Sequence, residues 1–285
     1  MVAPLRVCSL GPAHIAWGTG AVSGAKILIV ESNPPDLIAA QGYRACDQFK
    51  AAFAELEPSV KCRVAEPYAT KFQLEKLDDI DGVVFTGSGV NWSVDAKEAA
   101  PLRKVMEHVF HSDLPVWGSC NGMQLAAVVL GGSVRPSPNG LEVGVARDTR
   151  KTEAGKSHPA LDGRTDVYAV PCIHRDEVER LPKGAVLLAE NDHSPVQSFS
   201  YRAEGVDFWG AQYHPECSAT SISKTLRAGN GVFSAQTALI DDLEAGERDA
   251  RAAERLGTTC AALHPKERTR ELANWLMHVK DRISS

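Results

Sequence analysis

Repeated alternation between short strand-like runs and longer amphipathic segments is the feature that most constrains the fold. Strand-like runs occur at residues 26–31, 60–66, 83–86 and 114–118, and turn signals and helical patterns lie between them. Alternating strands and helices are typical of crossover units, which build parallel sheets. The chain is therefore predicted to adopt an α/β fold with a mostly parallel central sheet flanked by helices.

The rest of the chain adds two kinds of structure to this sheet. Residues 133–215 contain several short β-like runs, which predict extra antiparallel strands. From Ser218 onward the pattern is helical, and Leu272, Trp275 and Val279 form one apolar stripe near the end. A helical C-terminus that packs on the body of the protein is therefore expected.

Composition excludes several classes of protein. The net charge of −5 over 285 residues argues against a dedicated nucleic-acid binder. The seven cysteines are scattered and form no C-x-x-C pair, so neither a disulfide framework nor a metal site is expected, and a cytoplasmic location fits best. No apolar stretch approaches the length of a membrane span.

A glycine-flanked cysteine follows the fourth run. Gly118-x-Cys120-x-Gly122 lies between a strand and an apolar helix at 123–130, as in the G-x-S-x-G nucleophile elbow. Such a turn holds the nucleophile in a strained conformation at a helix N-terminus, which favours the thiolate form. The backbone N–H of Asn121 would then face a developing oxyanion. The alternative is a structural cysteine in a strand–helix turn.

A second motif supplies a base for that thiol. An apolar strand ends in His214, Pro215 and Glu216. Residues i and i+2 of an extended chain project to the same side, and proline favours extended geometry in the residue before it. Glu216 could therefore orient His214 while His214 takes the proton from Cys120. Alone, this motif also fits an exposed strand end.

Four motifs in order resemble one known family. VVFTGSG, VWGSCNGMQ, IHRDEV and QYHPE are similar to segments of class I glutamine amidotransferase domains of the GMP-synthase-like type, from about Lys26 to Glu216. The resemblance implies a flavodoxin-like three-layer fold and a Cys120, His214 and Glu216 triad. It also implies an N-terminal extension at 1–24, a catalytic domain at 25–235 and a helical C-terminal extension at 236–285.

The resemblance implies further site residues. The 87–89 loop would supply the second oxyanion N–H, near Gly87 or Ser88, and Gln124 would help to shape the glutamine pocket. Asp176 is a candidate contact for the substrate's α-amino group, although it could instead cap a turn, and His174 is expected to be structural. Many family members carry an aromatic residue where this chain has Asn121; because a backbone N–H acts there, activity is expected to survive.

The implied reaction is hydrolysis of a γ-amide through a γ-glutamyl thioester, without metal or organic cofactor. The first candidate function is a glutaminase that gives glutamate and passes ammonia to a separate synthetase subunit, since no acceptor domain is recognised in the chain. The second is a γ-glutamyl amide or peptide hydrolase that releases an amine. A non-catalytic regulatory module is a third alternative, which the intact Cys, His and Glu set argues against. Neither nucleic acid nor membrane is an expected partner.

Overall fold

The computed structural model describes residues 24–73, 76–229 and 236–284. Within them, a nine-stranded sheet has the order β2-β1-β3-β4-β11-β10-β9-β6-β7, and β5 and β8 form a separate two-stranded sheet. The first five strands of the large sheet are parallel, and each later neighbouring pair is antiparallel. The predicted α/β fold with a mostly parallel centre and added antiparallel strands is confirmed.

The parallel half of the sheet is built from apolar runs. Nearly every residue in its central strands is buried, as expected for strands covered on both faces. The five strands are β1 (Lys26–Val30), β2 (Lys61–Ala65), β3 (Gly82–Phe85), β4 (Pro115–Ser119) and β11 (Val206–Ala211).

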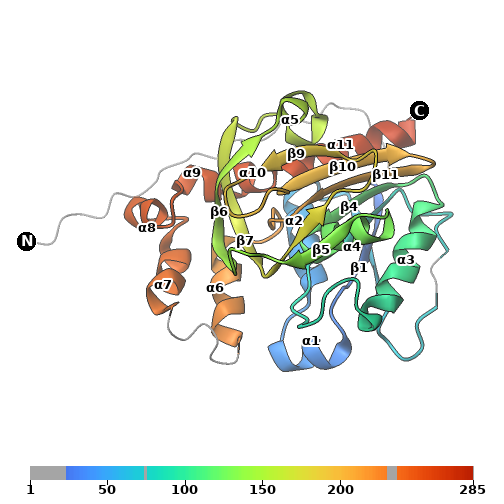
Figure 1. Ribbon diagram of the computed structural model, residues 1–285, viewed down its shortest axis with the longest axis horizontal. Coiled ribbons are helices and arrows are strands. Elements are labelled where there is room, and N and C mark those ends of the chain that lie inside the picture. The colour runs from blue at the N-terminus through green and yellow to red at the C-terminus, as the bar shows by residue number, and fades with distance from the viewer. Residues whose placement is uncertain (1–23, 74–75, 230–235, 285) are drawn as a thin grey trace, which may run out of the picture.

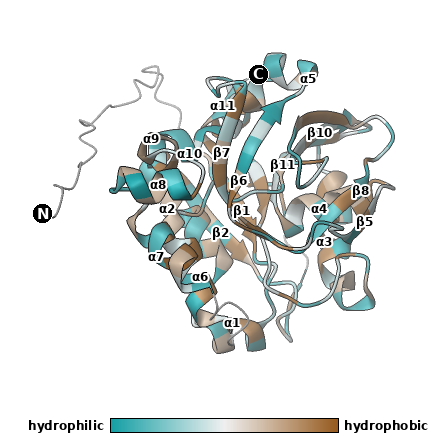
Figure 2. Ribbon diagram, turned by 60° about the vertical axis from the view of Figure 1, so that its left-hand side comes forward, coloured by the Kyte–Doolittle hydropathy of each residue, from teal (hydrophilic) through white to brown (hydrophobic). Residues whose placement is uncertain are grey.

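Two cores cover the two faces of this half, because side chains alternate along each strand. Ile27 and Ile29 point into one core, together with α2 (Ala45–Leu56) and α11 (Arg270–Ser284). Leu28 and Val30 point into the other, which α3 (Ala100–Phe110) and α4 (Asn121–Val129) cover. The result is a three-layer arrangement (Figure 1), with apolar residues concentrated on the central strands (Figure 2).

The antiparallel half extends the sheet beyond β11. It comprises β6 (Glu142–Lys151), β7 (Val167–His174), β9 (Val186–Glu190) and β10 (Ser198–Ala203), while β5 (Ser133–Pro136) pairs with β8 (Asp176–Arg180). A third core packs β6 and β7 against α6 (Ala219–Ala228), α7 (Thr237–Ala245), α8 (Ala250–Arg255) and α9 (Cys260–Leu263). Short helices complete the chain: α1 (Pro35–Gln41), η1 (Lys97–Ala99), α5 (Glu153–Ser157), η2 (Pro159–Leu161) and α10 (Pro265–Arg268).

The segment after β1 differs from its expected form. The apolar pattern from Leu37 to Leu56 predicts one helix, but the structure has α1 and α2 with a break at Gly42. Gly42 adopts φ 74°, the left-handed conformation that ends many helices. The place of Asp36 before this pattern predicts a capping side chain, but the N-cap residue is Pro34, and no side chain caps the helix. Helix α1 buries no residue, whereas α2 places Phe49 and Phe53 in the core.

Other expectations concern the ends of the chain. The expected N-terminal extension at 1–24 falls outside the described residues except for Gly24. At the other end, α11 buries Leu272, Trp275 and Val279 in the core shared with α2, so the helical C-terminus is confirmed. None of the helices in the described part of the chain has the length and apolar character needed to span a lipid bilayer.

A buried ion pair ties α11 to the sheet, and its removal should destabilise the fold. Glu271 accepts hydrogen bonds from Arg164 at 2.9 and 2.7 Å and from the Tyr213 hydroxyl at 2.9 Å. The Arg164 and Glu271 side chains are 3% and 1% exposed. Because Glu271→Ala leaves the guanidinium charge buried without a partner, we expect a loss of about 3–5 kcal/mol, measured by urea denaturation.

The exposed pair of Arg63 and Asp79 provides the control. Screening by water limits the contribution of such pairs, so Asp79→Ala should cost less than about 1 kcal/mol. Equal losses in the two variants would contradict the assignment of Glu271 as a structural anchor.

Candidate active site

Three strand ends meet at one edge of the sheet. Strand β4 pairs in parallel with β3 on one side and with β11 on the other, with Phe85 opposite Gly118 and Ser119 opposite Ala211. The carboxyl ends of parallel neighbours lie at the same edge, where α/β proteins place their ligands. The segments that follow these strands therefore come together: residues 86–89, Cys120 and residues 212–217.

Cys120 occupies a strained turn between β4 and α4. Its backbone has φ 49° and ψ −104°, a combination that non-glycine residues rarely adopt. The flanking glycines are required by packing, since a Cβ at position 122 would lie 2.4 Å from the Phe85 carbonyl oxygen and one at position 118 would lie 2.7 Å from Gly122. Cys120 is also the N-cap residue of α4. This is the geometry of a nucleophile elbow.

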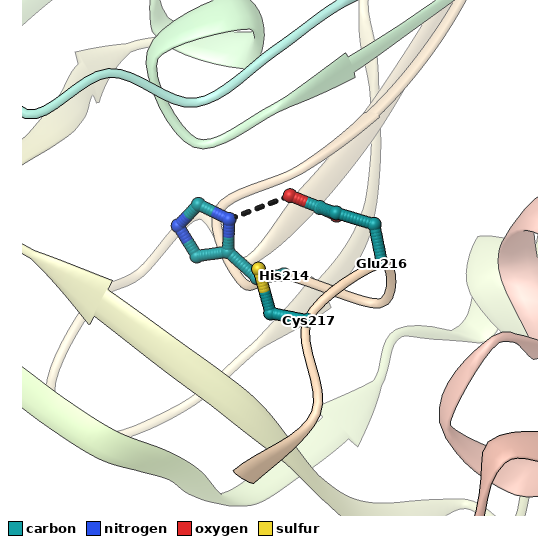
Figure 3. A group of neighbouring side chains, drawn as sticks. All are labelled: His214, Glu216 and Cys217. Carbon is teal, nitrogen blue, oxygen red and sulfur yellow. Dashed lines mark hydrogen bonds and ion pairs between the residues drawn. The ribbon is translucent and has the colours of Figure 1, made fainter. Parts of the chain in front are cut away.

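His214 and Glu216 form a buried pair on the neighbouring loop. Nδ1 of His214 and Oε1 of Glu216 are 2.7 Å apart, and the side chains are 8% and 2% exposed (Figure 3). The Ser119 hydroxyl donates to the other carboxylate oxygen of Glu216 at 2.9 Å and accepts from Nε1 of Trp117 at 2.9 Å. The carboxylate is therefore fixed from both sides, and it fixes the imidazole in turn.

The thiol and the imidazole line the same cavity, which has a volume of about 370 Å³. Nε2 of His214 is buried and makes no hydrogen bond of normal geometry, although the ring interacts with the thiols of Cys120 and Cys217. Burial opposes the charged ring, but the charge of Glu216 and the contacts with both thiols raise the pKa of His214 well above its usual value. A protonated His214 is therefore well stabilised in this site.

Cys217 adds a second thiol beside the ring (Figure 3). Ligand atoms of His214, Glu216 and Cys217 lie within 4.8 Å of one another, and all three residue types bind zinc. However, ligands around tetrahedral zinc are roughly 3.3 Å apart, given metal–ligand distances of about 2.0–2.2 Å, whereas Nδ1 and Oε1 are separated by 2.7 Å. This contact is a hydrogen bond. Burial and the Glu216 charge raise the pKa of Cys217, so its thiol form is favoured.

The 87–89 loop lies against the imidazole. A Cβ on Gly87 would be 2.5 Å from Cε1 of His214, so only glycine lets the backbone approach the ring this closely. The loop is held from β1, because Oδ1 of Asn33 accepts from the Gly89 N–H at 2.9 Å and lies 3.0 Å from the Ser88 hydroxyl. Asn121 is the first residue of α4 and is buried. The candidate oxyanion donors thus line the same cavity as Cys120.

Gln124 and Asp176 lie together in the lining of the cavity. Nε2 of Gln124 donates to the Asp176 carbonyl oxygen at 2.7 Å, and the Asp176 carboxylate accepts two hydrogen bonds from Arg175. His174 also lines the cavity, but both of its ring nitrogens have partners, with Nε2 2.7 Å from Glu142 and Nδ1 3.1 Å from the Asp176 carbonyl oxygen. Gln124 therefore fixes the wall that carries Asp176, and His174 has the internal partner expected of a structural residue.

Sequence reasoning missed several residues of the site. Ser119 could have been found from its position immediately before the nucleophile. Strand residues two apart share a side, so Ser119 lies on the same side as its hydrogen-bond partner Trp117. Asn33 and Tyr43 lie in the segment after β1, and no motif marks them. Cys217 follows the His–Pro–Glu motif directly, but the sequence alone marks it only as one of seven scattered cysteines.

Comparisons of the sequence with known proteins agree with this geometry. The family model for the class-I glutamine amidotransferases matches residues 47–229. A γ-glutamyl-L-1-hydroxyisopropylamide hydrolase from a Pseudomonas species is 33% identical over 63% of this chain and 62% of its own length. A glutamine-hydrolysing GMP synthase from Clostridium novyi is 32% identical over 62% of this chain, but over only 32% of its own length.

Solved structures share the fold. A glutamine amidotransferase from Thermotoga maritima superposes with a TM-score of 0.62 at 20% identity, covering 90% of this chain and 97% of the other. One from Methylobacillus flagellatus gives a TM-score of 0.55 at 20% identity, covering 92% and 94%. The fold, the elbow and the family match lead to one conclusion: the chain belongs to the class-I glutamine amidotransferase family.

Proposed function

We propose that this protein hydrolyses the γ-amide of a γ-glutamyl compound, with Cys120 as nucleophile, His214 as acid and base, and Glu216 as the residue that orients His214. The single observation that carries this proposal is the shared cavity, in which a strained elbow thiol lies beside a buried His–Glu pair. Covalent acyl transfer requires a nucleophile, a base beside it and a third group that orients the base.

The reaction would proceed in two halves. The Cys120 thiolate attacks the amide carbon, and the carbonyl oxygen becomes an oxyanion. Protonated His214 then gives its proton to the departing nitrogen, so that the C–N bond breaks and a γ-glutamyl thioester remains. Water adds to the thioester with His214 as base, which releases glutamate and restores the thiol.

Backbone donors would stabilise the oxyanion. We assign the N–H of Asn121 as one donor and an N–H near Gly87 or Ser88 as the other. Donors of this kind are effective because the loop and the helix start hold them in place before the reaction. The hydrogen bonds from Ser88 and Gly89 to Asn33 provide that support for the loop.

The polar wall would bind the amino-acid end of the substrate. The Asp176 carboxylate suits an α-ammonium group, while Gln124 holds the backbone that carries Asp176. The neighbouring Arg175 is the cation on this wall, and it suits an α-carboxylate. No metal or organic cofactor takes part in this scheme.

Glutamine is the simplest substrate that fits. Its hydrolysis would give ammonia for a separate synthetase subunit. In a glutamine-hydrolysing synthase, the amidotransferase part supplies ammonia in this way. A second candidate is an N-substituted γ-glutamyl amide, from which an amine is released. The 33% identity to a hydrolase named for such an amide favours this second candidate.

The test is a substrate panel on the purified chain. Glutamate release is measured for glutamine and for a series of γ-glutamyl alkylamides, and kcat/KM values are compared. Turnover of any member supports γ-amide hydrolysis, and the order of kcat/KM values separates the two candidates. Absence of turnover for every member would contradict the proposal.

Cys120→Ala should abolish turnover without unfolding the protein. The thioester cannot form without the sulfur, so kcat should fall by at least about 10⁴-fold, while the circular dichroism spectrum is unchanged. Cys62→Ala is the matched control, because Cys62 lies on β2 away from the cavity and should leave kcat within about twofold. Activity of Cys120→Ala at the wild-type level would refute the assignment of Cys120 as the nucleophile.

Gly87→Ala should impair the reaction by moving the imidazole. The added Cβ would overlap Cε1 of His214, and a displacement of about 1 Å can cost about 100-fold in rate. At Gly89 a Cβ would have no neighbour closer than 3.5 Å, so Gly89→Ala should lose less than about fivefold. Equal effects on kcat in the two variants would argue against the close packing of Gly87 on the ring.

Glu216→Gln should lower the pKa of His214, as measured by NMR titration of its imidazole. The variant keeps the burial that disfavours the charged ring but loses the charge that favours it. In the wild type, the folded-state pKa lies above the unfolded value of about 6.5. The pair therefore contributes stability that is complete below this pH and is lost as pH rises through the folded-state pKa. An unchanged titration midpoint would show that Glu216 does not act on His214.

A further inference from the structure

The cavity has two walls of different character. The polar wall, described above, carries Gln124, Arg175 and Asp176. The other wall comes from α1, the residues just after it, and α6. We call it the amine wall, and it comprises Leu37, Ala40, Tyr43, Ile222, Thr225 and Ala228, together with the uncharged polar residues Gln41 and Ser221.

The amine wall is uncharged and mostly apolar. Among the described residues that line the cavity, none from α1 or α6 carries a charge. The charged residues of α6 lie on another face, where Arg227 pairs with Asp241 and Glu244. Ile222, Thr225 and Ala228 follow one another at three-residue intervals, so they share the face of α6 that is turned to the cavity.

The amine wall lies on the His214 side of the thiol. Cys217 contacts the His214 ring, and α6 begins two residues later at Ala219. The Tyr43 hydroxyl interacts with Thr225 and is close enough to His214 and Cys217 to sense their charges. Burial is the main cause that raises the pKa of Tyr43, so this hydroxyl is largely removed from water. Helices α1 and α6 lie at the same end of the molecule in both views (Figures 1 and 2).

The polar wall also adjoins the thiol. Sγ of Cys120 approaches the carbonyl oxygen of Ile173 at 3.7 Å, and Ile173 directly precedes the segment that carries Arg175 and Asp176. Gln124 then joins α4 to the Asp176 carbonyl. The reacting sulfur therefore lies in a cavity that has both a charged, polar surface and an uncharged, mostly apolar one.

The chemistry of the proposed function decides which part of the substrate meets which wall. His214 must protonate the departing nitrogen, so the amine leaves beside the imidazole. The two charged groups of the glutamyl chain meet Arg175 and Asp176, which form the charged surface of the cavity. Any substituent on the amide nitrogen is then directed at the amine wall, whereas the ammonia of glutamine would leave that wall in contact with water.

We propose that the amine wall binds the substituent of an N-substituted γ-glutamyl amide and selects an uncharged, apolar amine as leaving group. This inference rests on the proposed γ-amide hydrolysis and adds the substrate class. Apolar contact favours an alkyl or aryl substituent in proportion to the area it buries. A charged substituent would lose hydration with no partner on this wall.

An isosteric pair of substrates tests the selection for an uncharged amine. In γ-glutamyl-n-propylamide the substituent ends in a methyl group, and in γ-glutamyl-(2-aminoethyl)amide an ammonium replaces it. We expect kcat/KM to be at least about tenfold higher for the propylamide, and higher for it than for glutamine. Equal values for the pair, or preference for the ammonium compound, would overturn the inference.

A matched pair of variants tests the position of the amine wall. Ala40 lines the cavity and is exposed to it, whereas its neighbour Ala39 is exposed elsewhere on α1. Ala40→Trp fills the space in front of the wall, so the ratio of kcat/KM for γ-glutamylbenzylamide to that for glutamine should fall at least about tenfold. Ala39→Trp should leave the ratio unchanged.

The outcomes separate this inference from the proposed function. If the wild type hydrolyses neither glutamine nor any amide, the proposed function fails and the inference fails with it. If the wild type hydrolyses γ-amides but Ala40→Trp leaves the substrate ratio unchanged, γ-amide hydrolysis stands and the amine wall is wrong. A fall in the ratio in Ala40→Trp alone supports the inference.

Discussion

The parallel pairing of β4 with both β3 and β11 is the constraint on which the site depends. This register aligns three strand ends, so that the 87–89 loop, Cys120 and the 212–217 loop meet although the first and last are more than a hundred residues apart. The strain at Cys120 is tolerated because both flanking elements are buried and because its N–H donates to the Ala211 carbonyl at 2.7 Å. Strand pairing, rather than any local motif, brings the thiol and the imidazole into one cavity.

The helical C-terminus supports the 212–217 loop from behind. Nη1 of Arg268, at the end of α10, donates to the Pro215 carbonyl oxygen at 2.8 Å, and Glu271 on α11 accepts from the Tyr213 hydroxyl. Both residues are buried. Since Tyr213 and Pro215 flank His214, the last helices hold the backbone on both sides of this residue. Helices α10 and α11 therefore support the site from outside the cavity, and α11 also forms part of the core.

Much of the fold was predictable because its signals are local. Apolar runs mark β1, β3 and β4, and the glycines around Cys120 mark the elbow, since each close approach excludes a side chain. The sequence pattern does not reveal the break at Gly42. Helix α1 has no buried residue, so only the apolar pattern of α2 indicates a helix in this segment. The amine wall was also beyond prediction: Leu37, Tyr43 and Ile222 come together only through tertiary packing, and apolar residues at helical spacing usually indicate core.

The central claim is that the sulfur of Cys120 carries the acyl group. The most direct measurement is peptide mass spectrometry on protein acid-quenched during turnover of a γ-glutamyl amide, which locates the thioester. The account predicts a γ-glutamyl adduct on the peptide that contains Cys120, and its absence in His214→Ala because attack then lacks its base. An adduct on Cys217 instead, or rapid turnover without any adduct on a cysteine, would contradict it.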